Sequence, residues 1–398
     1  MGRFVDRYGN RFLRIEHADQ MPPFFMSLVS HSDHWMFISS SGGLSAGRGN
    51  EDNALFPYYT DDKITRIVPW TGPITALRVS KGGKTYLWHP FSSKYEGIYP
   101  IDRHLSKSVW GNELLFEEVN KELQIRFAYR WRFSERFGFV RSCELINESA
   151  EDVQIDLLDG VQNILPYGVD SGLQNERSNL ANAYKRSELH PESKLGVYAL
   201  SAIIVDRAEP AEALKASVCW SMGLPDAQVL VSSEQIPAFL RGEDVAQETD
   251  KKGVAGAYLL NDRFELPTKK CKEWHLCLDG QKSQPQIMDL VRRIQSDVQG
   301  LKKDVEEDLL NDGIELKKIV AKADGLQQTA DELCVARHYA NVLFNVMRGG
   351  IFEEDYRIET KDWAEYIHSM NNLLFETNKK HFEALPAEME YSQLQKAD

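Results

Sequence analysis

The sequence has few cysteines and no long apolar run. Its five cysteines, among 398 residues, are widely separated, and no pairs of them have the spacing of a zinc site. We therefore expect a reducing, cytoplasmic environment and no bound metal. No run approaches the roughly 18 apolar residues of a transmembrane helix, and the N-terminus lacks a basic segment followed by an apolar one. The sequence predicts neither a membrane span nor a signal peptide.

Positive charge is also scarce, since 47 Lys and Arg stand against 60 Asp and Glu, for a net charge of -13. Nucleic-acid binding needs clustered Lys and Arg, and no such block occurs, so nucleic acid is not an expected partner. The glycine patterns of nucleotide-binding loops and the Gly-x-Ser-x-Gly motif of serine hydrolases are absent as well. This disfavours ATPase, dehydrogenase and serine-hydrolase functions, and we expect no cofactor.

Residues 1–280 have the pattern of a β domain. The clearest strand is the segment from Leu123 to Phe133, in which apolar and polar residues alternate with a period of two. Its apolar positions are Leu123, Ile125, Phe127, Tyr129, Trp131 and Phe133, and its polar positions include Gln124, Arg126, Arg130 and Arg132. Short polar or glycine-containing links join the predicted strands, which favours a large antiparallel sandwich over alternating strands and helices.

Residues 281–398 have the pattern of an α-helical segment. Apolar residues recur at spacings of three and four from Ile287 to Val305, and this helix is expected to end near Asn311-Asp312-Gly313. Two further helices are predicted over Asp331–Met347 and from about Thr360 to Leu385. The apolar stripe on the first helix either packs on the chain's own sandwich, which we favour, or pairs two copies in a homodimer.

The stretch from Gly42 to Asp62 shows neither period and is rich in aromatic and acidic residues. Disordered segments are poor in aromatics, so we interpret it as an ordered surface loop. Sugars present apolar C–H faces beside hydroxyl groups, which suits aromatic rings with nearby Asp, Asn or Arg. The alternative is that these aromatics only fill a core or shape a rim. The candidate ligand-binding residues here and just beyond are Arg48, Tyr58, Tyr59, Asp62 and Trp70.

No catalytic residue can be named from the pattern. Asp61 and Asp62 are adjacent, and adjacent residues in an extended segment point in opposite directions, so they are not expected to act as a pair. His31 and His34, with Asp33 between them, could bind a metal or transfer protons. Loop histidines more commonly form caps and ordinary hydrogen bonds, and no third ligand can be assigned.

Four segments together resemble a known family. They are GGLSAGRGNEDNALFPYYTDDKI, TGPIT, SCELINESAEDVQIDLLDGVQNILPYG and HYANVLFNVMRGGIFEEDY. The combination resembles the N-terminal region of cellobiose-phosphorylase-like proteins. The resemblance implies a super-β-sandwich of the galactose-mutarotase type, then linker helices, then an (α/α)6 barrel that carries the catalytic acid. Such a barrel needs several hundred more residues than this sequence contains, so the resemblance implies fold and substrate class but no catalytic residue.

Three functions remain open at this point. The first is a non-catalytic carbohydrate-binding or accessory domain of a glycoside phosphorylase or hydrolase, with an oligosaccharide or an adjacent (α/α)6 barrel as its partner. The second is a self-contained enzyme similar to a mutarotase or epimerase, which needs an acid and a base on one sheet face. The third is a structural or assembly module. We expect the first.

Overall fold

The computed structural model describes residues 2–59, 61–95, 97–176, 178–202, 213–324, 326–347 and 357–390. The chain divides into two compact units, Met1–Gly313 and Ile314–Asp398. Strands give way to long helices between Ser283 and Gln284, close to residue 281 where the sequence predicts the change. The first of these helices nevertheless belongs to the same compact unit as the strands.

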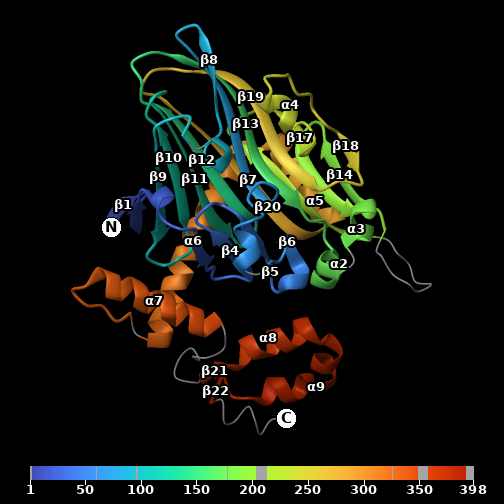
Figure 1. The fold of residues 1–398 in the computed structure, drawn as a ribbon. Helices are drawn as coiled ribbons and strands as arrows, with labels where there is room; N and C mark the ends of the chain where they lie inside the picture. Colours follow the sequence, from blue (N-terminus) through green and yellow to red (C-terminus); the bar gives the residue numbers. More distant parts are fainter. Residues whose placement is uncertain are drawn as a thin grey trace. The chain divides into compact units, whose positions relative to one another are not determined.

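One layer of the first unit is an 11-stranded sheet with the order β1-β2-β9-β10-β11-β12-β20-β16-β15-β14-β18 (Figure 1). Its strands pair antiparallel throughout, as the short links in the sequence predict. They are β1 (Gly2–Arg7), β2 (Asn10–Glu16), β9 (Ile101–Ser108), β10 (Leu114–Asn120), β11 (Ile125–Ser134), β12 (Gly138–Asn147), β14 (Lys185–His190), β15 (Leu195–Leu200), β16 (Lys215–Met222), β18 (Asp250–Lys252) and β20 (Cys271–Ser283).

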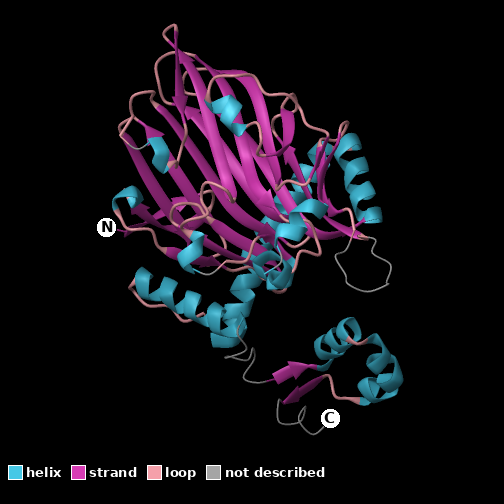
Figure 2. Cartoon of the chain, turned by 45° about the vertical axis from the view of Figure 1, so that its right-hand side comes forward, coloured by secondary structure: helices cyan, strands magenta, loops and turns pink. Residues whose placement is uncertain are grey.

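Two smaller antiparallel sheets make the opposite layer (Figure 2). One has the order β17-β19-β13-β7-β8, with β7 (Gly72–Lys81), β8 (Lys84–Trp88), β13 (Val153–Ile164), β17 (Gln228–Ser232) and β19 (Gly256–Leu266). The other has the order β3-β4-β5-β6, with β3 (Phe25–Leu28), β4 (His34–Ser39), β5 (Leu44–Arg48) and β6 (Ala54–Phe56). The predicted mainly β fold, a large antiparallel sandwich followed by helices, is confirmed.

The hydrophobic core lies between the two layers. Strand β11 turns Phe127, Tyr129, Trp131 and Phe133 into it, while Arg126, Arg130 and Arg132 lie on the other face. Leu77 and Leu157 meet these rings from the five-stranded sheet, and Met36 and Ile38 meet them from the four-stranded sheet. Burying each such side chain contributes about 1.5–3 kcal/mol, so the alternation in the sequence is what fixes the face that β11 buries.

The first long helices are α5 (Gln284–Ser296) and α6 (Val298–Asp324), separated at Asp297. Their apolar stripe packs on the sandwich, because Val291, Leu301 and Val305 are buried in one cluster with Val218 and Trp220 of the large sheet. The predicted helix end at Asn311–Gly313 is wrong, since α6 continues to Asp324. Hydrogen bonds from Asn112 and Ser30 to the Asp312 carboxylate stabilise that residue inside the helix.

Shorter helices connect the strands of the first unit. They are η1 (Ala18–Gln20), η2 (Glu51–Asn53), α1 (Asp61–Ile64), η3 (Ser93–Tyr95), α2 (Ser171–Glu176), α3 (Ser178–Tyr184) and α4 (Ile236–Leu240). Helix α4 covers the outer side of the five-stranded sheet, where Phe239 packs with Leu158 and Leu259.

The second unit contains the end of α6, α7 (Glu332–Met347), β21 (Arg357–Glu359), α8 (Thr360–Met370), α9 (Asn372–Ala384) and β22 (Glu388–Glu390). The single helix predicted from Thr360 to Leu385 is two helices, because Asn371 interrupts it and its side chain accepts a hydrogen bond from the Leu374 amide at 3.0 Å. Rings of Trp363 and Phe382 join the two helices, 5.0 Å apart. Within the described ranges, no helix combines the length and the apolar character needed to cross a membrane.

The interpretation of Gly42–Asp62 as a loop without regular structure is wrong for much of its length. The segment contains β5 and β6, joined through η2. Strand β5 reads Leu-Ser-Ala-Gly-Arg, so small residues occupy the positions where strands usually carry β-branched or aromatic ones, and the period of two is hidden. Pairing with β4 on one side and β6 on the other holds it as a strand.

Candidate functional site

Four aromatic side chains form a continuous row on the outward face of the four-stranded sheet. Phe25 of β3 stacks on Phe37 of β4 with ring centroids 5.5 Å apart. Trp35 lies 5.8 Å from Phe37 on one side and 5.7 Å from Tyr58 on the other. We call Phe25, Phe37, Trp35 and Tyr58 the aromatic ledge. Edge and offset contacts between the rings fix their orientations relative to one another.

The register of β4 explains why these rings face outward. Met36 and Ile38 point into the core with no exposed area, so their neighbours Trp35 and Phe37 point to the other face. Small residues lie opposite them, because Trp35 pairs with Gly47 and Phe37 pairs with Ser45 on β5. Neither ring is therefore crowded by a large side chain from its pairing partner on β5.

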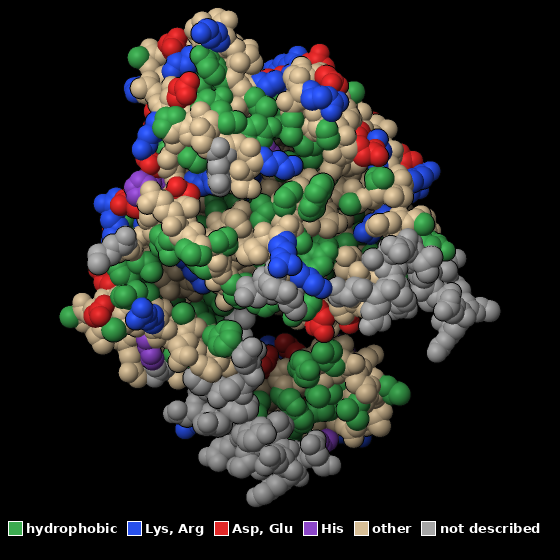
Figure 3. Space-filling view, in the orientation of Figure 1, with side chains coloured by type: hydrophobic (Ala, Val, Ile, Leu, Met, Phe, Trp, Pro, Cys, Tyr) green, Lys and Arg blue, Asp and Glu red, His purple; other side chains and the backbone are tan. Residues whose placement is uncertain are grey.

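The ledge is open to solvent at both ends. Phe25 is 42% exposed and Tyr58 is 36% exposed, whereas Trp35 and Phe37 are partly buried. The Trp35 indole nitrogen donates a hydrogen bond to the Asn50 carbonyl at 3.1 Å, which fixes the ring at the rim of the sheet. Figure 3 shows hydrophobic side chains, in green, exposed among polar and charged ones on the side of the first unit that carries β4, β5 and β6 in Figure 1.

Arg48, one of the predicted ligand-binding residues, lies at the end of β5 and is held by its own chain. Its guanidinium binds the carboxylates of Asp33 and Asp279 at 2.8 Å and 3.1 Å and donates to the Glu135 carbonyl at 3.2 Å. Burial opposes the charge, but these two carboxylates outweigh it and raise the pKa of Arg48. The cavity beside Arg48 is about 10 Å³, room for about one water molecule and not for a sugar ring.

The other predicted residues all lie between β6 and β7 in the chain. Tyr58 belongs to the aromatic ledge, and the Tyr59 hydroxyl accepts a hydrogen bond from Gln174 at 3.4 Å. Trp70 follows α1 and is 70% exposed. Asp62 lies in α1, and its side chain lies outside the described part of the structure. The structure thus brings Tyr58 together with three rings that the sequence analysis missed as candidates. The alternation of Trp35 and Phe37 with Met36 and Ile38 is the signal that could have found two of them.

The outward face of the large sheet carries charged groups, and these are already paired. Glu117 of β10 binds Arg7 at 2.6 Å and Arg126 at 3.0 Å and also contacts Arg14. Burial alone raises the pKa of Glu117, but the hydrogen bonds from Arg14 and Arg7 outweigh it and hold the pKa at about 2. His104 pairs with Glu117 across the sheet, and burial and then Arg14 lower its pKa. Arginines thus hold Glu117 ionised, and burial favours the uncharged form of His104.

The predicted histidine pair forms structural hydrogen bonds rather than a shared site. His31 Nδ1 lies 2.8 Å from the buried Asp312 carboxylate of α6, and that hydrogen bond raises the pKa of His31. His34 Nδ1 lies 2.7 Å from the Ser32 hydroxyl. Burial, followed by the Arg48 charge, lowers the pKa of His34 to about 3, so that ring stays neutral.

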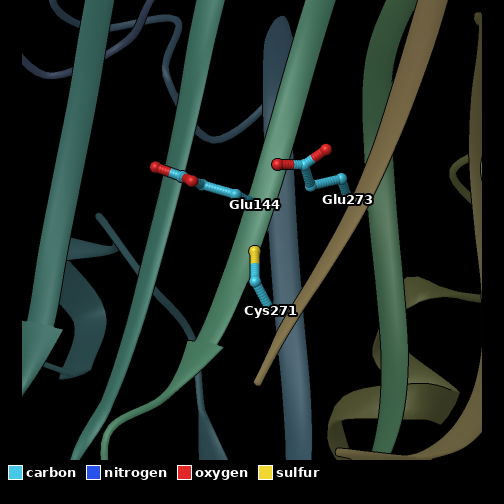
Figure 4. A group of neighbouring side chains, drawn as sticks. All are labelled: Glu144, Cys271 and Glu273. Carbon is cyan, nitrogen blue, oxygen red and sulfur yellow. The ribbon is translucent and has the colours of Figure 1, made fainter. Parts of the chain in front are cut away.

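Among the described residues, the one group with the spacing of metal ligands is Glu144, Cys271 and Glu273 on strands β12 and β20 (Figure 4). Their ligand atoms lie within 4.8 Å of one another. Glu144 is already engaged by the hydroxyl of Tyr8 and by Arg126. Burial, with help from the two carboxylates, raises the pKa of the Cys271 thiol to about 11, so a metal would have to displace a proton that the site retains.

One segment of the chain matches the model of a known protein family. Residues 352–398 match the family model of glycoside hydrolase family 149 insertion domain 1, in agreement with the resemblance to glycoside phosphorylases and hydrolases. Among curated proteins, no sequence matches the chain.

Several solved structures of sugar-active proteins are similar at low identity. A bacterial glucoamylase complexed with acarbose has a TM-score of 0.45 and 9% identity, over 81% of this chain and 42% of its own. A candidate kojibiose phosphorylase from the human microbiome has a TM-score of 0.44 and 10% identity, over 84% and 41%. A GalM/aldose epimerase homologue from C. elegans has a TM-score of 0.37 and 9% identity, over 66% and 100%. The chain spans about two fifths of the glucoamylase and of the kojibiose phosphorylase.

Proposed function

We propose that this chain is the sandwich-and-linker part of a glycan-processing protein, and that its sandwich binds an oligosaccharide or polysaccharide without transforming it. The aromatic ledge carries this proposal. Its rings are held in a row on a rigid sheet, with small residues beside them. A sugar chain that lies along the row can place the apolar C–H face of successive rings on Phe25, Phe37 and Trp35.

The energetic argument favours a preformed surface of this kind. Trp35 and Phe37 are already ordered by their contacts with each other and with β5, so little side-chain entropy is lost when a ligand binds. At the rim of the sheet, sugar hydroxyls would replace their hydrogen bonds to water with hydrogen bonds to polar groups near Asn50. The Asn50 carbonyl already accepts a hydrogen bond from the Trp35 indole. The family match at residues 352–398 supports the carbohydrate class of the ligand.

A reaction within the sandwich is less well supported. On the outward face of the large sheet, arginines hold Glu117 ionised, and burial favours the uncharged form of the neighbouring His104. The resemblance to cellobiose-phosphorylase-like proteins would put the catalytic acid in an (α/α)6 barrel. Such a barrel is the proposed partner, and a homodimer would have to use a surface other than the Ile287–Val305 stripe, which packs on the sandwich.

Titration of the full chain with soluble glucans, galactans and their oligosaccharides tests the proposal. We expect saturable binding to at least one of them by isothermal titration calorimetry, with no change in the reducing-end content of the sample. A Trp70→Ala variant in the same titration shows whether that exposed indole contributes. Absence of binding to every glycan at millimolar sugar would contradict the proposal.

A further inference from the structure

Three turns converge at one end of the sandwich and enclose an open groove of about 250 Å³. The turns join β7 to β8, β10 to β11, and β12 to β13. The groove is lined by Lys81, Lys84, Tyr86, Glu122, Leu123 and Glu151, and we call it the turn groove. In Figure 1 the β8 hairpin stands at the top of the first unit and β4 and β5 lie at its bottom, so the turn groove and the aromatic ledge are at opposite ends.

The turn groove is preformed because its turns are tied to one another. The β7–β8 turn is Gly82-Gly83, with φ of 56° and 76°, and this positive-φ pair suits a tight type I′ hairpin, a conformation that strains most residues other than glycine. Lys81 Nζ donates to the Leu123 carbonyl at 3.0 Å and so joins the first turn to the second. The Glu148 amide donates to the Gln124 carbonyl at 2.8 Å and joins the second turn to the third.

One aromatic ring lies in the groove among groups that donate and accept hydrogen bonds. Tyr86 packs against the hydrophobic core of the sandwich. Two ammonium groups, Lys81 and Lys84, face two carboxylates, Glu122 and Glu151, so the lining has no net charge.

This combination selects the chemical class of the ligand. A lining with equal numbers of cations and anions gives no net attraction to an ion, whereas a neutral polyol can donate to the carboxylates and accept from the ammonium groups. The ring of Tyr86 supplies an apolar platform for the C–H face of a sugar. The volume lies just below the roughly 300–1,000 Å³ typical of small-molecule pockets, which suits one sugar ring and not a chain.

We propose that the turn groove is a second binding site, for a single neutral pyranose, with Tyr86 as its platform and Glu122 and Glu151 as hydroxyl acceptors. The inference rests on the proposed function for its ligand class, but it concerns a different end of the molecule and different residues. It predicts that the chain recognises free monosaccharides or glycan ends independently of the aromatic ledge.

Saturation-transfer difference NMR on the full chain with D-glucose and D-galactose tests the inference. We expect transfer to the ring protons of at least one sugar. Tyr86→Ala should weaken its apparent affinity about tenfold or more, which corresponds to about 1.4 kcal/mol, while Tyr86→Phe, which keeps the ring, should leave it within a few-fold. Trp35→Ala, a variant of the ledge, should have no effect. If Tyr86→Ala does not fold, as judged by circular dichroism, the Glu122→Gln, Glu151→Gln pair takes its place.

The outcomes separate the two sites. Equal saturation transfer to the sugar from wild type and from Tyr86→Ala, or no transfer to either sugar, would contradict the proposed site in the turn groove. Loss of monosaccharide binding in Trp35→Ala would also overturn it, because the signal would then come from the ledge. The chain could also bind a monosaccharide through Tyr86 and bind no polysaccharide. That result would support the site in the turn groove and contradict the proposed function of the aromatic ledge.

Discussion

Gly47 lies directly opposite Trp35 in the pairing of β5 with β4, and a Cβ atom at position 47 would stand 2.7 Å from the Trp35 indole. The same atom would lie 2.6 Å from the Asn53 carbonyl oxygen and 2.7 Å from the Cα of Ala54. Backbone surrounds position 47 on that side, so the crowding cannot be relieved by a side-chain rotation alone. The absence of a side chain at Gly47 is what makes room for the Trp35 indole in the aromatic ledge.

Gly47→Ala should therefore weaken glycan binding and also destabilise the sandwich. Overpacking of this kind costs about 1–3 kcal/mol, which urea unfolding would measure. Gly280→Ala is the matched control, because the nearest atom to its Cβ is the Ser217 hydroxyl at an ordinary 3.9 Å. Equal stability of the two variants would contradict the close approach of β5 to Trp35.

The interior of the sandwich contains a fully buried ion pair, and Asp159→Asn should destabilise the fold strongly. Arg141 binds Asp159 through two hydrogen bonds of 2.8 Å and 2.9 Å, and neither side chain has exposed area. Trp274 and Thr75 donate to the same carboxylate at 2.7 Å and 2.6 Å. Removing one partner of such a pair leaves a buried charge unpaired and costs about 3–5 kcal/mol, measurable by urea unfolding.

The comparison for this prediction is Asp250→Asn, which removes a surface ion pair with Arg186 and should change stability only slightly. Replacement of both buried partners together, Arg141→Met with Asp159→Leu, should recover much of the loss because no charge remains to be solvated. If Asp159→Asn lowers the free energy of unfolding as little as Asp250→Asn does, the Arg141–Asp159 pair is not buried as described.

The arginine cluster around Glu117 predicts a specific pH dependence. The pKa of Glu117 lies at about 2 in the folded chain, below its ordinary 4.5, because Arg14 and Arg7 outweigh the effect of burial. A group with a lowered folded pKa stabilises the fold fully above its unfolded pKa and loses that contribution as the pH falls through the folded value. The stability difference between wild type and Glu117→Gln should therefore be constant above about pH 4.5 and should shrink toward pH 2.

Urea unfolding of both chains across this range measures that difference. A difference that grows as the pH falls would contradict the assignment of a lowered pKa to Glu117.

Much of the sandwich could be predicted from local pattern, and the parts that could not depend on distant segments. The alternation from Ile125 to Phe133 fixed which face β11 buries, and the spacing from Ile287 to Val305 identified the stripe that packs on the large sheet. The strand β5 was missed because Ser45, Ala46 and Gly47 carry no apolar period. Its conformation comes from pairing with β4 and β6, which a local pattern does not contain.

The candidate site was found only in part, for a similar reason. Tyr58 could be selected because it stands in an aromatic, acidic stretch of sequence. Phe25 joins the ledge only through the pairing of β3 with β4, which sets Ser27 opposite Phe37 and brings the Phe25 ring diagonally onto it. The turn groove needs three hairpins that are separated by tens of residues, so no single window of the sequence indicates it.

The central claim is that the aromatic ledge binds a glycan, and isothermal titration calorimetry of a ledge variant tests it most directly. The titrant is the soluble glycan that binds wild type best, and the variant is Trp35→Ala with Phe37→Ala. Tyr366→Ala is the control, since it removes a ring that is 57% exposed in the second unit. If the aromatic ledge binds the glycan, the folded double variant should bind it about tenfold more weakly or not at all. The control should bind the glycan as wild type does. Unchanged affinity in the folded double variant would contradict it.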